Sequence, residues 1–134
     1  MQISNFDDLL AAARQQAIPQ RLLFLFASVE LPSGASEKEQ IDFANGNGGA
    51  LVPLMSVDKS PESIVSFGQL SDEANSYAPD WKFVFVAALQ NPFGQPIDIK
   101  MVDDALNRMT QDLKMGQIEG FVPFDRFGNT VNFQ

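Results

Sequence analysis

The sequence contains neither cysteine nor histidine. Without histidine, the chain lacks the side chain that ordinarily titrates near neutral pH, and Ser-His-Asp and Cys-His catalytic arrangements are excluded. Zinc, haem and iron–sulfur sites of the usual ligand types are excluded with them, so we expect no metal and no cofactor. Without cysteine there is no disulfide framework to indicate an oxidising compartment, and we expect a cytoplasmic protein.

Clustered positive charge is also lacking. Nine lysines and arginines stand singly along the chain against 17 aspartates and glutamates, which gives a formal net charge of −8. Nucleic-acid binding relies on clustered cations that displace phosphate counterions, and anionic membrane surfaces repel an acidic chain. No stretch reaches the roughly 20 apolar residues of a membrane-spanning helix. We therefore expect neither nucleic acid nor a membrane as a partner.

Apolar residues are abundant enough for one folded domain over residues 1–134. They make up 45% of the chain and include 12 phenylalanines. A chain near this length buries roughly two-thirds of the surface that its unfolded state exposes. The sequence therefore predicts a single globular domain with a substantial core.

Four segments have the pattern of helices. Ser4 or Asn5 can cap the first helix, and Ser36 with Glu39 forms a capping box for the second. A proline after Ser60 is typical of a helix start, and Asp98 can cap the last helix. The predicted helices span residues 6–17, 37–44, 61–77 and 99–115, and the buried face of the third is expected to include Ile64, Phe67, Leu70, Ala74 and Tyr77.

Strand patterns alternate with these helices. The ranges 22–29 and 83–89 are almost wholly apolar, as in strands that are covered on both faces. The range 50–57 contains Pro53, and a terminal hairpin over 121–124 and 130–133 contains Pro123. Because proline cannot donate to a strand ladder, the proline-bearing strands are expected at the sheet edges or at a bulge.

The resulting fold class is α/β or α+β, with a four- to five-stranded sheet in the order second, first, third, fourth. Alternating helices and strands favour layers, and parallel pairs would require right-handed crossovers. An approximate two-fold axis would instead make the two central strands antiparallel. The sequence leaves both arrangements open.

The approximate two-fold axis would follow from an internal duplication of the chain, which is a hypothesis. The range 19–32 aligns with 79–92 at an offset of 60, and 51–54 resembles 121–124 at an offset of 70. The pseudo-repeats would be 1–59 and 60–134, each an α-β-α-β unit. The alternative is that buried strands resemble one another without common descent.

Six residues are candidates for binding a ligand or partner, and none is a catalytic candidate. The loop from Asn45 to Gly49 precedes a strand, whereas phosphate-binding glycine loops follow one, so it is interpreted as a helix cap and turn or, alternatively, as a ligand loop. Loop aromatics can form an apolar docking patch or cover the sheet ends. The candidates are Asn45, Asn47, Trp81, Phe93, Asp125 and Arg126.

Four runs span most of the chain: FDDLLAAA at 6–13, GGALVPLMSVDK at 48–59, FVFVAAL at 83–89 and FDR at 124–126. In these runs the sequence resembles a family of short uncharacterised bacterial proteins, some of which carry the label ribonucleotide reductase subunit alpha. That enzyme's large subunit needs cysteines for its thiyl radical and a far longer chain for its barrel. The label is therefore rejected, and the resemblance implies no catalytic residue.

Two functions remain as hypotheses. The first is a non-enzymatic binding or accessory protein that acts through protein–protein contacts, including the contacts of a homo-oligomer. The alternative is a small-ligand-binding protein, or a carboxylate-dependent enzyme, with a pocket near the loop 45–49 or near Arg126. This alternative predicts a concave pocket that contains at least one strongly perturbed carboxylate.

Overall fold

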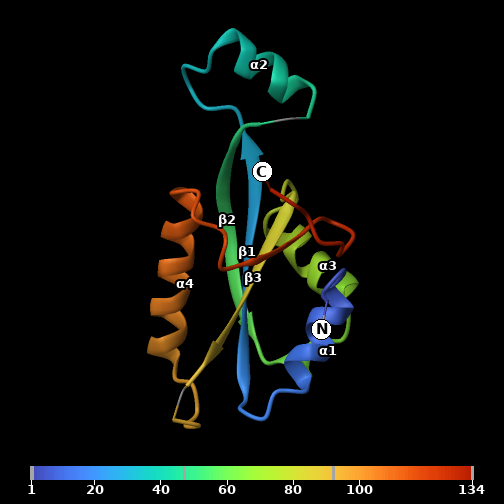
Figure 1. The fold of residues 1–134 in the computed structure, drawn as a ribbon, viewed down its shortest axis with the longest axis vertical. Coiled ribbons are helices and arrows are strands. Elements are labelled where there is room, and N and C mark those ends of the chain that lie inside the picture. The colour runs from blue at the N-terminus through green and yellow to red at the C-terminus, as the bar shows by residue number, and fades with distance from the viewer. Residues whose placement is uncertain (1, 47, 92, 134) are drawn as a thin grey trace.

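The computed structural model describes residues 2–46, 48–91 and 93–133. In this part of the chain, helices alternate with strands, and the strands form one four-stranded sheet (Figure 1). The elements are α1 (Phe6–Arg14), β1 (Gln20–Glu30), α2 (Glu37–Ala44), β2 (Ala50–Lys59), the 3-10 turn η1 (Pro61–Ser63), α3 (Phe67–Tyr77), β3 (Phe83–Gln90), α4 (Ile99–Lys114) and β4 (Val122–Phe124).

The sheet has the order β2-β1-β3-β4, and each neighbouring pair is antiparallel. The predicted strand order is confirmed, and the class is α+β. The two apolar strands lie in the middle because both of their faces are covered. The antiparallel arrangement of β1 and β3 decides the strand directions that the sequence left open.

Proline marks both edges of the sheet, as expected. In β2, Phe26 of β1 pairs with Met55 whereas Ala27 pairs with Pro53, so one extra residue forms a bulge at the proline. In the other edge strand, β4, Pro123 lies opposite Phe85. A proline at these positions removes no hydrogen bond from the interior of the sheet.

The register of the central strands β1 and β3 supports the duplication hypothesis, whereas the registers of the edge strands β2 and β4 do not. Leu25 lies opposite Phe85, 60 residues later, as an approximate two-fold axis between β1 and β3 requires. The two Val-Pro segments occupy different registers, since Pro53 pairs with Ala27 but Pro123 pairs with Phe85. Duplication therefore stays a hypothesis.

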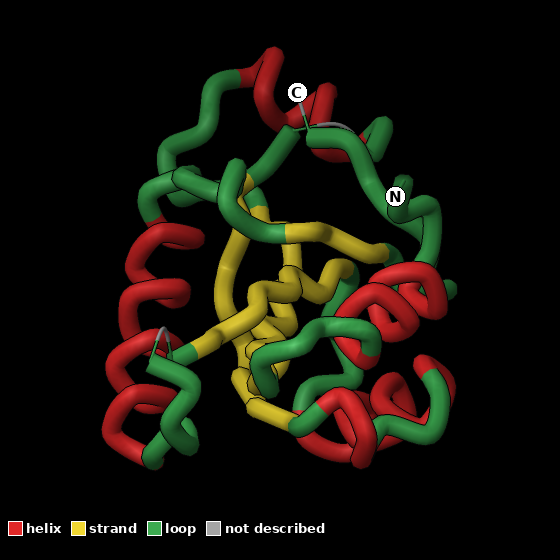
Figure 2. The backbone as a smooth tube through the Cα atoms, turned by 60° about the horizontal axis from the view of Figure 1, so that its bottom comes forward, coloured by secondary structure: helices red, strands yellow, loops and turns green. Residues whose placement is uncertain are grey.

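Each face of the sheet has its own core, and Figure 2 shows helices on both sides of the strands. On the first face, α1 and α3 cover alternate residues of the strands, with Phe6, Phe24, Phe26, Trp81 and Phe124 among the buried side chains. On the second face, α4 and the segment after it cover the intervening residues, which include Leu23, Leu25 and Phe85.

Helix ends follow local chemistry closely. The Asn5 side chain caps α1, and the Ser36–Glu39 capping box at α2 is present in full. The Asp98 side chain accepts a hydrogen bond from the Met101 backbone at the start of α4. These predictions are confirmed because a cap depends only on residues within one turn.

Three predicted boundaries are wrong. The first helix ends at Arg14, and the third is split: after η1, the Ser66 side chain caps a new helix that begins at Phe67. Tyr77 is 78% exposed and does not belong to the buried face. The second half of the terminal hairpin is reduced to an isolated bridge between Phe124 and Thr130.

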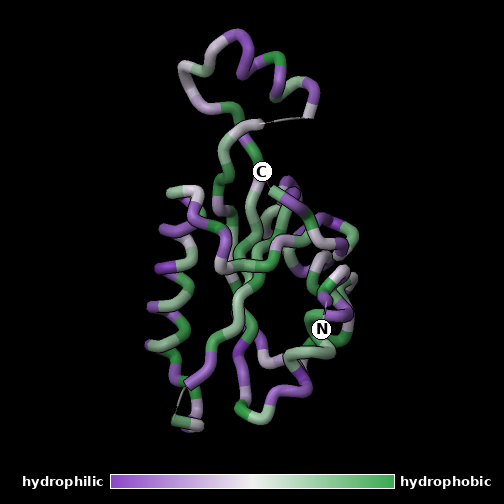
Figure 3. Tube along the Cα trace, in the orientation of Figure 1, coloured by the Kyte–Doolittle hydropathy of each residue, from purple (hydrophilic) through white to green (hydrophobic). Residues whose placement is uncertain are grey.

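Among the described residues, no helix is both long enough and apolar enough to cross a membrane. Figure 3 shows the apolar stretches concentrated along the central strands, whereas α4 alternates between hydrophilic and hydrophobic residues. This alternation fits a helix with one face on the sheet and the other in solvent.

Candidate functional site

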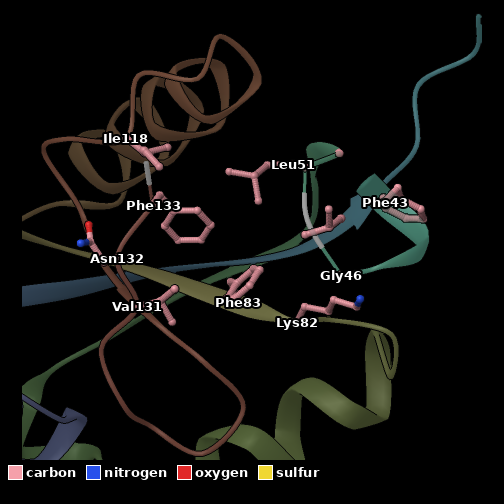
Figure 4. A pocket seen from close by; sticks show the side chains of 12 residues that line it. Phe43, Gly46, Leu51, Lys82, Phe83, Ile118, Val131, Asn132 and Phe133 are labelled. Carbon is pink, nitrogen blue, oxygen red and sulfur yellow. The ribbon is translucent and has the colours of Figure 1, made fainter. Parts of the chain in front are cut away.

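The second face of the sheet ends in an open groove of about 510 Å³ beside α2 (Figure 4). Its floor consists of Val29, Leu51 and Phe83, from β1, β2 and β3. Val29 lies opposite Leu51, and Phe83 lies opposite Ala27 on the other side of β1. The groove is therefore the uncovered end of the second core.

The segment after α4 forms one wall of the groove through Ile118, Val131 and Phe133. The Phe133 ring contacts Phe83 edge-on, with 5.0 Å between ring centroids and an interplanar angle of 76°. Tilted and edge-on pairs of this kind are favoured by the quadrupoles of the two rings. This contact fixes the C-terminal segment against β3.

The opposite wall comes from α2 and the glycine loop after it. Phe43 of α2 is half-buried and lies over Gly49, which has a φ of +93°. A Cβ atom at Gly49 would lie 2.6 Å from Cγ1 of Val29 and 3.0 Å from Cδ2 of Phe43. Glycine is required at this position both by the left-handed backbone and by the close approach of the phenylalanine ring.

Lys82 carries the one charge among the described residues that line the groove. Its backbone N–H donates to the carbonyl of Ala27 at 2.8 Å, and it precedes Phe83 on the floor. Lys82 takes part in none of the ion pairs found between described residues. In a chain of net charge −8, an apolar groove with a free cation favours an apolar ligand that carries negative charge.

A perturbed carboxylate is missing from this lining in the described part of the chain. The carboxylate whose pKa clearly departs from its usual range is Glu39, which is exposed at the start of α2. Hydrogen bonds from the backbone and side chain of Ser36 lower the pKa of Glu39. This shift arises from the helix cap of α2 and not from the groove.

Asn45, the described candidate of the loop, is absent from the groove lining. Asn45 is the C-cap of α2, and its backbone N–H donates to the carbonyls of Ile41 and Asp42. Asn47 lies outside the described residues. Gly46, Gly48 and Gly49 line the groove. The loop is a helix cap and turn, and its glycines contribute to a binding surface through their backbone.

Trp81 and Arg126, two further candidates, are brought together at the other face. Trp81 is fully buried, and the Arg126 guanidinium lies over its ring at 4.7 Å from the centroid. Arg126 also donates to the backbone carbonyls of Pro79 and Trp81 and to Oδ1 of Asn75. Asn75 Oδ1 accepts the indole N–H at 3.0 Å. This cluster joins the last turn of the chain to α3 and β3.

The remaining candidates lie apart from the groove. The Asp125 carboxylate accepts hydrogen bonds from the backbone of Phe127 and Asn129 and so shapes a turn. Phe93 is 84% exposed in the loop before α4. The loop aromatics therefore have different environments, since Trp81 is buried whereas Phe93 is exposed.

The residues that build the groove were missed as site candidates. Phe83 was assigned to the core, and Phe43 and Lys82 were not singled out. A helix with an aromatic residue just before a glycine-rich loop is a weak signal for the wall at Phe43. No local pattern indicates that Val29, Leu51 and Phe133 converge, because they are far apart in the sequence.

Comparisons with known proteins identify no relative of this chain. No family model matches the chain, and neither a curated protein nor a solved structure matches it significantly.

Proposed function

We propose that the chain is a non-enzymatic binding or accessory protein that acts through protein–protein contacts, with the groove beside α2 as its binding site. The observation that carries this proposal is an open groove with an apolar floor of Val29, Leu51 and Phe83 and with Lys82 as the one charge in its described lining. Such a surface favours a protein segment that presents apolar side chains next to a carboxylate.

Two properties of the groove support a protein segment as its ligand. The groove is partly open to solvent, so a protein segment can reach it without a gate. Its apolar residues come from strands already held in a sheet, which reduces the ordering cost on binding. Burial of apolar surface contributes roughly 25 cal/mol per Å², and Lys82 selects for negative charge.

Selection from a phage-displayed library of random dodecapeptides tests this proposal. We expect enriched peptides to combine apolar and acidic residues, because these match the floor and Lys82. Their binding should weaken on Lys82→Glu and on Phe83→Ala. Lys114→Glu is the matched control, since it reverses an exposed lysine in the last turn of α4, away from the groove lining.

Peptides that bind the groove variants as well as the wild type would contradict the proposal. Failure to enrich any peptide against a folded protein would contradict it too. Circular dichroism and urea unfolding of each variant separate a loss of binding from a loss of folding.

Small-ligand binding is the second candidate, because Gly46, Gly48 and Gly49 place the groove at the loop where that alternative expects a pocket. Its ligand would be a compact apolar carboxylate. Titration of ¹⁵N-labelled protein with octanoate tests it. Saturable shifts confined to groove amides would favour this candidate, and shifts that neither saturate nor depend on Lys82 would exclude it.

A further inference from the structure

Helix α2 stands at one end of the molecule, beyond the ends of β1 and β2 (Figure 1). None of its eight residues is buried, and all of them are described. Ile41 is 54% exposed, although its apolar side chain would be favoured in a contact. We refer to residues 30–44, which lead into and include this helix, as the arm.

An exposed helix of this length needs support. Isolated helices shorter than about 12–15 residues are marginal in water, and most helices in proteins are stabilised by packing of an apolar face. The capping box at Ser36 and Glu39 supplies hydrogen bonds but buries no apolar surface. Phe43 already anchors one side of the helix over Gly49, and a partner that covers Ile41 would add an apolar contact on the other side.

The two apolar side chains at the end of α2 point in different directions. Each residue advances a helix by about 100°, so Ile41 and Phe43 lie roughly 200° apart around its axis. Phe43 lies over Gly49 of the same chain and lines the groove together with Val29. Ile41 therefore faces away from its own groove and is free to contact another molecule.

The charges of arm and groove are complementary. The arm contains Glu30, Glu37, Glu39 and Asp42 against Lys38, a formal charge of −4 + 1 = −3. The one charge in the described groove lining is Lys82. An acidic segment with an exposed isoleucine has the chemistry that the groove favours.

We propose that the groove binds the arm of a second copy of this chain, in a reciprocal dimer. This inference rests on the proposed function of the groove. Arm and groove adjoin at the same end of the molecule, so a two-fold axis there lets each copy place its arm in the groove of the other. Such an isologous interface buries Ile41 twice and pairs the acidic arm with Lys82 twice.

Sedimentation velocity over a range of protein concentrations tests the proposal, with three variants of the full chain. Ile41→Gln removes the apolar arm contact with a residue that favours helix, and Lys82→Glu reverses the groove charge. We expect each to weaken dimerisation at least about tenfold, which corresponds to about 1.4 kcal/mol. Phe127→Asp is the control, since it alters a still more exposed apolar residue outside the groove.

Mixing the two variants tests whether the arm and groove changes act independently within a dimer. A mixed dimer keeps one intact contact, between the arm of Lys82→Glu and the groove of Ile41→Gln. Its other contact is damaged on both sides. If the two losses add, the mixed dimer has the mean stability of the two homodimers, so an equimolar mixture should contain an amount of dimer between those of the two variants at the same total concentration.

Three outcomes would overturn the proposal: a wild type that stays monomeric at millimolar concentration, a dimer that neither groove nor arm variant weakens, or a dimer lost on Phe127→Asp. A monomeric wild type whose groove still selects acidic apolar peptides would overturn self-association while leaving the proposed function intact. If neither a dimer nor selected peptides were found, both the reciprocal dimer and the proposed binding function would be overturned.

Discussion

The two faces of the sheet differ in how completely they are covered. On the first face, α1 and α3 enclose an aromatic cluster in which Phe6, Phe24 and Trp81 are at most 1% exposed. On the second face, α4 covers one part, and the groove beside α2 leaves Leu51, Phe83 and neighbouring apolar residues half-buried. The first face is closed, whereas the second leaves apolar surface accessible at the site for which we propose binding.

Aromatic contacts alone do not explain this difference. Trp81 and Phe26 pack at 5.1 Å between centroids on the first face, and Phe83 and Phe133 pack at 5.0 Å on the second. The pair geometry is similar, but only the first pair is completely buried. Coverage by helices, and not ring contact, decides how much each side chain contributes to stability.

The largest expected effect comes from truncating one aromatic side chain on each face. Trp81→Ala should lower the free energy of unfolding by about 3–5 kcal/mol, because it leaves a cavity and removes the ring beneath Arg126. Phe83→Ala should cost only about 1–2 kcal/mol, because the ring is already partly exposed. Urea unfolding at equilibrium measures both values.

Equal losses of stability for Trp81→Ala and Phe83→Ala would contradict the proposed difference in coverage between the two faces. Phe93→Ala is a control for aromatic truncation as such, since this ring is mostly exposed, and it should leave the unfolding midpoint almost unchanged.

A smaller effect is expected at the glycine that holds the groove wall. Gly49→Ala should lower the free energy of unfolding by about 2–3 kcal/mol, because it combines a left-handed φ with overlap of Val29 and Phe43. Gly46→Ala has a similar φ of +83° with nothing within 4 Å of its Cβ, so it should cost about 1 kcal/mol. Thermal and urea unfolding of the matched pair isolate the contribution of the close contact.

A Gly49→Ala variant as stable as Gly46→Ala would mean that Phe43 moves away at no cost. The groove wall would then be loosely held, and the contrast with the rigid first face would become sharper.

The smallest effect is a pH dependence confined to α2. Hydrogen bonds from Ser36 hold the pKa of Glu39 below its usual range in the folded protein. The stability that this cap contributes is therefore fully present above the pKa of the unfolded glutamate and is lost as pH falls through the lowered folded pKa. The protection factors of the Ser36 and Glu39 amides, which correct for the slower intrinsic exchange in acid, should fall over that acidic window, and Glu39→Gln should remove this pH dependence while amides in α1 and α3 stay protected.

Loss of protection in α1 or α3 over the same window would contradict this prediction, because it would place the titrating group in the first core and not in the arm.

Much of the fold was predictable because its signals are local or follow from burial. The apolar composition of the central strands and the prolines at 53 and 123 predict the strand order correctly. The helix from 61 to 77 was predicted wrongly because Ser66 caps a new start that competes with Pro61. Tyr77 was misplaced for the same reason, since its face was assigned from a continuous helical period.

The candidate site was predictable only at the loop from Asn45 to Gly49. Trp81 and Arg126 were both singled out, but nothing in the sequence indicates that the guanidinium packs on that indole, because the two residues are 45 positions apart. Lys82 is one lysine of several, and its importance follows only from its place beside an uncovered end of the second core.

By itself, the sequence determined the chemistry that is excluded, the helix caps and the division into central and edge strands, because each depends on residue type or on neighbours within one turn. The tertiary structure decided the strand directions, the Arg126–Trp81 packing and the groove. The groove requires Val29, Leu51, Phe83 and Phe133 to meet from four segments, and only the register of the folded sheet and the path of the C-terminal segment bring such distant residues together.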